Sequence, residues 1–267
     1  MTDTLIFRAS TRVTGFTLLA ALAVAALAGC AHHDAATGEA ARWQQSRQLV
    51  LVTVPDWDSD HGTLRTYERS ADGWRQIDAA VPVTIGRAGA AWGLGLHSAQ
   101  PGVQKREGDG RAPAGVFAIG TAFGYADSAG TALPYAAMGA SHYCIDVNDS
   151  PLYNRIVDAN VVGAEAIKGS TEPMRRDLHA DGDQRYRLGF VVEHNVEARP
   201  GAGSCIFAHL WKSPTDATAG CTAMDPAAMD RLLSWLQPSQ RPVLVLLPEH
   251  EYLRLRGAWQ LPQPESP

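Results

Sequence analysis

The chain has 267 residues, of which 45% are hydrophobic and 19% charged, and this apolar share suffices for a folded domain with its own core. The formal net charge is −5 at pH 7, and the basic residues, nearly all of them arginine, form no run. A slightly acidic chain without a basic cluster argues against nucleic acid as a partner.

The N-terminal 29 residues have the composition of a secretory signal peptide. Arg8 and Arg12 precede an uncharged stretch, residues 13–27, that is rich in Ala, Leu and Val. This stretch is shorter than a membrane-spanning helix of about 20 residues, so we expect residues 1–29 to be removed. It leads into Leu-Ala-Gly-Cys, which ends at Cys30 and resembles a bacterial lipobox.

The lipobox resemblance implies that Cys30 becomes the lipidated first residue of the mature protein. Ala31 gives no aspartate signal for retention in the inner membrane, which favours the inner, periplasmic leaflet of the outer membrane of a Gram-negative bacterium. The alternative is an ordinary secretory signal followed by a cysteine by chance. We expect residues 30–47 to be the lipidated cysteine and a flexible tether, residues 48–261 one domain, and residues 262–267 a tail.

From residue 48 onward the pattern is that of β-strands. Short runs rich in Val, Ile and aromatic residues are bounded by Gly and Pro, and a turn at residues 71–73 marks a hairpin. These runs predict a mainly β fold, largely antiparallel, arranged as a sandwich or barrel with one or two short α-helices. The expected strands are residues 49–54, the hairpin 63–77, and residues 81–86, 115–119, 190–194, 206–211 and 243–247.

One helix is well marked near the C-terminus. Asp225 suits the cap, Pro226 suits the first helical position, and apolar residues then recur at helical spacing until Pro238. The apolar positions are Met229, Leu232, Leu233 and Leu236. A weaker helix is expected near residues 161–167.

Three cysteines remain once Cys30 is lipidated, an odd number in a compartment that oxidises thiols. At least one thiol must therefore stay unpaired. A disulfide between Cys144 and Cys205 would leave Cys221 free, but sequence alone does not place their Cα atoms within bridging distance. The pairing stays open at this point.

The strand at 206–211 carries His209, and a short loop leads on to Thr218-Ala-Gly-Cys221. Acyl transfer through a thiol needs a thiolate, a base that generates it and donors for the developing oxyanion. His209 can take the proton of Cys221, and Gly220 permits a tight turn that presents backbone N–H groups to a substrate carbonyl. The spacing alone is equally compatible with a buried cysteine near a core histidine.

Several separated motifs resemble the L,D-transpeptidase (YkuD-like) catalytic domain, in which a histidine on a strand precedes an S/T-x-G-C turn. The resemblance covers about residues 48–250. Its motifs here are His209 with Thr218-x-Gly220-Cys221, Lys105-x-x-Gly108-Asp109-Gly110-x-x-Pro113-Ala114-Gly115-x-Phe117, Tyr153-Asn154, and Gly203-Ser204 before the histidine strand.

The resemblance implies a fold, a reaction and roles for individual residues. Cys221 would be the nucleophile and His209 the base, with the Gly220 backbone in the oxyanion hole and the carbonyl of Leu210 orienting the imidazole. Family members attack a peptidoglycan stem peptide at the L-centre of its diamino acid, release the terminal D-amino acid and hold a thioester that an amine or water resolves. No metal or organic cofactor is implied. Residues predicted to contact substrate are His194, Asn195 and Thr218.

The chain also departs from better-known family members, because Cys221 is followed by Thr222 and Ala223 where an aliphatic residue and then Arg or Asn are usual. Transpeptidation, carboxypeptidase-like trimming and cross-link cleavage share the first half-reaction, so the thiol does not decide among them. A further alternative is a non-catalytic, wall-binding lipoprotein. Such a protein has no need of an unpaired cysteine beside a histidine.

Overall fold

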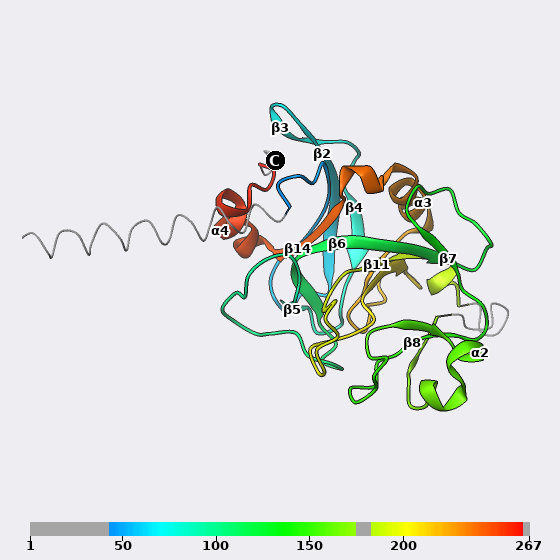
Figure 1. The fold of residues 1–267 in the computed structure, drawn as a ribbon. Coiled ribbons are helices and arrows are strands. Elements are labelled where there is room, and N and C mark those ends of the chain that lie inside the picture. The colour runs from blue at the N-terminus through cyan, green and yellow to red at the C-terminus, as the bar shows by residue number, and fades with distance from the viewer. Residues whose placement is uncertain (1–42, 175–182, 264–267) are drawn as a thin grey trace, which may run out of the picture. The chain divides into compact units, whose positions relative to one another are not determined.

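Eight strands close into a mixed β-barrel in the computed structural model, which describes residues 43–174 and 183–263 (Figure 1). Neighbouring strands are antiparallel except for two parallel pairs, β1 with β14 and β12 with β13. The barrel order is β1 (Gln48–Val54), β14 (Val243–Pro248), β6 (Ala112–Gly124), β11 (Leu188–Val192), β12 (Phe207–Leu210), β13 (Thr222–Met224), β4 (Val81–Thr84) and β2 (His61–Ser70), which pairs with β1.

Shorter strands extend this barrel. The strand β3 (Gly73–Gln76) forms the expected hairpin with β2, and β5 (Ala90–Trp92) and β7 (Tyr135–Ala137) each pair with β6. A separate three-stranded sheet consists of β8 (His142–Cys144) flanked by β9 (Ile156–Asp158) and β10 (Glu172–Pro173). We call this second sheet the small sheet; in Figure 1 β8 lies with α2 beside the barrel.

The core is built from strands that are apolar on both faces. In β1 every residue except Thr53 is buried, and all six residues of its parallel neighbour β14 are buried. Parallel strands covered on both sides read as continuous apolar runs, which explains the sequences of β1 and β14. Each fully buried Val or Leu contributes about 1.5–3 kcal/mol relative to an exposed one.

Three α-helices occur in the described ranges. The predicted helix near the C-terminus is α3 (Pro226–Trp235): Asp225 accepts a hydrogen bond from Ala227 N–H, and the expected apolar positions are buried. The weaker expected helix is α2 (Ala159–Val162), which Gly163 separates from a 3₁₀ turn, η1 (Ala164–Ile167). The third, α4 (Glu249–Trp259), was not predicted; it buries one stripe, Tyr252, Leu255 and Trp259.

The mainly β fold class and its short helices are thus confirmed. Two further 3₁₀ turns, η2 (Arg185–Arg187) and η3 (Pro238–Gln240), complete the elements. The predicted signal peptide, the lipidated Cys30 and most of the tether lie outside the described residues. Within residues 43–174 and 183–263, no helix is long and apolar enough to cross a membrane.

Candidate active site

Two parallel strands bring His209 and Cys221 to one face of the barrel wall. In the β12–β13 register, Ala208 lies opposite Thr222 and His209 opposite Ala223. Cys221 directly precedes β13, and continuing this register by one residue places it beside Phe207, whose N–H contacts the Cys221 sulfur. Because side chains alternate along strands, Cys221 and His209 point to the same side.

The Cys221 thiol is buried, with 7% of the residue exposed. Its sulfur accepts a hydrogen bond from Phe207 N–H at 3.3 Å and donates one to the carbonyl of Cys205 at 3.5 Å. No hydrogen bond joins the sulfur to His209 among the residues that the structure describes. In this state the thiol proton faces a backbone carbonyl and not the imidazole.

The other two described cysteines form a disulfide. Cys144 on β8 bonds to Cys205, which precedes β12, with Cα atoms 5.9 Å apart. The bond fastens the small sheet to the strand that carries His209. Among the described cysteines, Cys221 is the free one. The pairing that the sequence left open is therefore the one that keeps Cys221 as a thiol.

The turn before Cys221 is held by the hydroxyl of Thr218. Its Oγ1 donates to the carbonyl of Cys221 at 2.7 Å and accepts from Gly220 N–H at 3.0 Å. Gly220 has φ +153°, and a Cβ there would lie 2.9 Å from the carbonyl oxygen of Arg111, so a side chain does not fit. Since the Gly220 N–H is already bonded, its oxyanion role, like substrate contact by Thr218, stays a prediction.

The imidazole of His209 is oriented by its neighbour's backbone. Nδ1 lies 2.8 Å from the carbonyl of Leu210, and because a carbonyl only accepts, Nδ1 carries the proton and Nε2 is left as a base. Tyr186 on η2 packs edge-on against the ring, with centroids 5.3 Å apart. This contact with Leu210 is the one that the family resemblance implies, and its catalytic role stays a prediction.

Burial favours the neutral forms of both Cys221 and His209. It raises the pKa of Cys221 to about 12, with a further contribution from the negative charge of Glu172. Burial also lowers the pKa of His209 to about 4. The desolvation cost of a thiolate or an imidazolium here exceeds the stabilisation that nearby hydrogen bonds and charges provide. At pH 7 the resting pair is therefore a thiol and a neutral imidazole, not an ion pair.

An acidic group that the sequence analysis missed lies close to the thiol. Glu172 on β10 is partly buried, accepts a hydrogen bond from the hydroxyl of Tyr186, and has a pKa raised by burial to about 7. Its charge is felt at Cys221, and Tyr186 links it to His209. No local pattern marks Glu172, because the pairing of β10 with β8 brings it here.

The loop before His209 rests on the other motif residues. Asn154 Oδ1 accepts from Cys205 N–H at 2.9 Å, and its Nδ2 donates to the carbonyls of His194 and Asn195. Ser204 donates to Glu107 Oε2 at 2.6 Å. The motif at 105–117 supplies a buried ion pair, Lys105 with Asp109 at 2.5 Å.

His194 and Asn195 use their side chains to hold backbone. Nδ1 of His194 accepts from Leu94 N–H, and its Nε2 donates to the carbonyl of Ala202. Asn195 Nδ2 donates to the carbonyls of Arg199 and Gly203. The structure therefore places both side chains in the scaffold of the loops around them, and their predicted substrate contact stays a prediction.

Comparison with known proteins identifies the family of this chain. The sequence model of the L,D-transpeptidase catalytic domain (YkuD) matches residues 58–245, more than half of the chain. No curated protein and no solved structure matches it. Among the described residues, no group of three or more His, Cys, Asp or Glu side chains is arranged to hold a metal ion. The chain belongs to the family of L,D-transpeptidase catalytic domains, which implies a peptidoglycan-modifying activity outside the cytoplasm.

Proposed function

We propose that the protein is a cysteine-dependent L,D-transpeptidase that acts on peptidoglycan stem peptides through a thioester. The observation that carries the proposal is the pairing of one free thiol with one oriented imidazole on a single face of the barrel, while the other two described cysteines are joined. A wall-binding module would gain nothing from this arrangement.

In the first half-reaction the thiol proton leaves the Cys205 carbonyl for Nε2 of His209, and the sulfur attacks the carbonyl carbon at the L-centre of the diamino acid. The tetrahedral intermediate collapses as the C–N bond breaks. The departing D-amino acid takes the proton from His209, so that neutral amine and thioester remain.

In the second half-reaction an acceptor amine attacks the thioester and gives its proton to His209. The C–S bond breaks, the thiolate recovers that proton, and a new amide links two stem peptides. With water as acceptor, the same steps give a shortened peptide. The chemistry of Cys221 is common to both outcomes, so products identify the acceptor.

Product analysis tests the proposal directly. Purified sacculi or tetrapeptide muropeptides are incubated with the protein, and the products are followed by mass spectrometry. We expect cross-linked dimers from wild type, tripeptides in addition where water competes, and neither from Cys221→Ala. Identical products from wild type and Cys221→Ala would exclude the enzymatic function, and tripeptides alone would assign a hydrolase.

We also propose how the protein is anchored. Residues 1–29 are a signal peptide, and Cys30 is lipidated and holds the protein in the periplasmic leaflet of the outer membrane. Residues 30–47 tether the catalytic domain (48–261) to this anchor, and residues 262–267 form a tail. The lipobox-like Leu-Ala-Gly-Cys supports it. We expect palmitate labelling of wild type and none of Cys30→Ser, which should also leave the membrane fraction. Equal labelling of both chains would contradict the anchor.

A further inference from the structure

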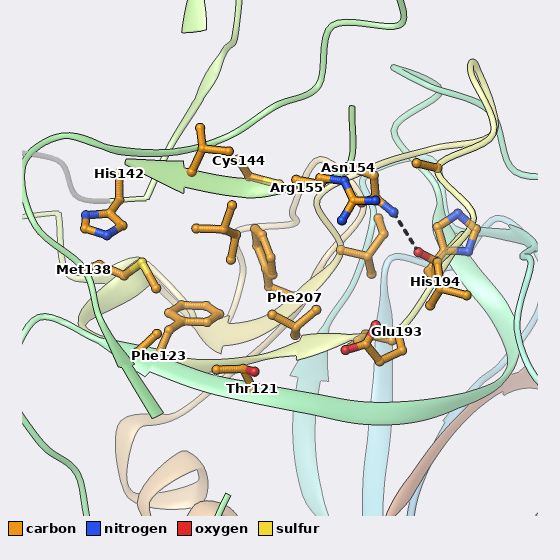
Figure 2. A pocket seen from close by; sticks show the side chains of 18 of the residues that line it. Thr121, Phe123, Met138, His142, Cys144, Asn154, Arg155, Glu193, His194 and Phe207 are labelled. Carbon is orange, nitrogen blue, oxygen red and sulfur yellow. Dashed lines mark hydrogen bonds between the residues drawn. The ribbon is translucent and has the colours of Figure 1, made fainter. Parts of the chain in front are cut away.

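A cavity of about 610 Å³ lies between the barrel and the small sheet (Figure 2). This volume is within the range of small-molecule and peptide sites. One wall comes from β6 and the end of β11, the other from β8, β9 and the residues before β9. The apolar part of the lining includes Phe123, Met138 and Phe207.

The cavity adjoins the thiol without containing it. Neither Cys221 nor His209 lines it, but Phe207 does, and the N–H of Phe207 holds the sulfur of Cys221 at 3.3 Å. Cys144, also in the lining, is bonded to Cys205, whose carbonyl accepts the thiol proton. A ligand in the cavity would therefore contact β12 and the disulfide, the two features whose backbone groups hold the Cys221 sulfur.

One wall carries a carboxylate without a partner. Glu193 is partly buried, forms no hydrogen bond or ion pair through its carboxylate within residues 43–174 and 183–263, and has a pKa raised by burial alone. It packs so closely on β6 that a Cβ at Gly120 would lie 2.1 Å from its Oε1. An uncompensated, partly desolvated charge is costly, and a bound cation would offset that cost.

The facing wall carries a cation that is also unpaired. Arg155 is exposed, and its guanidinium forms no ion pair or hydrogen bond to any residue described. Figure 2 shows Arg155 beside Asn154 on the wall opposite Glu193. The other ionisable groups of the lining already have hydrogen-bond partners: His142 accepts from Gly139 N–H, Asp158 accepts from Asn160 N–H, and both ring nitrogens of His194 are bonded to backbone.

We propose that this cavity binds a short peptide that carries both a free ammonium group and a free carboxylate. Glu193 would receive the ammonium and Arg155 the carboxylate, with the apolar lining between them against the side chains. A purely anionic ligand would leave Glu193 uncompensated, and an uncharged glycan would leave both charges unpaired. Glu193 also borders two neighbouring cavities of about 420 and 580 Å³, which leaves room for a longer chain.

This second peptide site rests on the proposed function, but its binding is tested without the acyl-transfer chemistry. Binding is measured by NMR titration of the full-length Cys221→Ala chain in detergent, with trialanine, N-acetyl-trialanine and trialanine amide as probes. We expect trialanine to bind, and each cap to weaken binding about tenfold because it removes one ion pair.

Variants assign each charge to its partner. In the same background, Glu193→Gln should abolish the effect of N-acetylation, and Arg155→Gln should abolish the effect of amidation. The controls are Glu165→Gln and Arg75→Gln, which are exposed and away from the cavity and should leave both effects unchanged. Equal binding of capped and free peptides, or no binding by the folded chain, would overturn the proposal. A failed product assay would leave this result standing, since Cys221 is absent from the titrated protein.

Discussion

His209→Gln is expected to lower the rate of Cys221 acylation at pH 7 by about 100- to 10,000-fold, the range that a general base supplies. Glutamine keeps a donor for the carbonyl of Leu210 but cannot accept the thiol proton. The loss should be large because burial raises the pKa of Cys221 to about 12, so almost no thiolate exists without a base. Release of the terminal D-amino acid from a tetrapeptide, in a single turnover, measures the rate.

The pH dependence should identify the cause of that loss. Below the raised pKa of the thiol, each unit of pH increases the thiolate tenfold, so the His209→Gln rate should climb steadily towards pH 10 and approach that of wild type. Wild type should depend less on pH because the neutral imidazole accepts the proton. His250→Gln, on the exposed surface of α4, is the matched control. A wild-type rate in His209→Gln at pH 7 would remove His209 from the mechanism.

Reduction of the Cys144–Cys205 disulfide is expected to destabilise the domain by about 4 kcal/mol, as chain entropy predicts for a cross-link of this span. The two cysteines are 61 positions apart, and the bond holds the small sheet to the barrel. For a domain of this size the loss corresponds to a fall of about 10 °C in Tm. Calorimetry with and without dithiothreitol checks the value.

The double variant Cys144→Ser, Cys205→Ser should show the same low Tm and no further response to dithiothreitol. Acylation should also slow in this variant, because Cys205 contacts Cys221 through its carbonyl and its own position depends on the bond. Cys221→Ala is the control, since it should respond to dithiothreitol as wild type does. An unchanged Tm on reduction, or a peptide map with Cys221 in a disulfide, would contradict the pairing.

Features with a local sequence signal were predictable. The strands β1 and β14 are apolar runs, and α3 has a cap, a first-turn proline and a buried stripe. Predicting these three elements therefore required no knowledge of distant contacts. The placement of His209 and Cys221 depended on family motifs, because their spacing alone also fits a buried cysteine near a core histidine. The parallel pairing of β12 with β13 supplied the shared face that spacing could not.

Features created by distant contacts were not predictable. The strands of the small sheet have two or three residues each, too few for any periodicity to show, and they exist through pairing and the disulfide. Glu172 comes near Cys221 only through the pairing of β10 with β8, and Tyr186 packs against His209 from η2. The helix α4 was missed because Leu253, exposed beside its buried stripe, blurs the amphipathic pattern.

The disulfide also constrains how the protein matures. Three cysteines, Cys144, Cys205 and Cys221, allow three single disulfides, and only the pair Cys144–Cys205 leaves Cys221, the proposed nucleophile, as a thiol. If Cys221 is the nucleophile, as we propose, oxidation that joins it to either partner during folding would yield a molecule without activity but with the same composition and mass. Rescue then requires a thiolate to exchange with the wrong bond, a step that an isomerase accelerates. The active yield in an oxidising compartment therefore depends on which cysteine pair closes first.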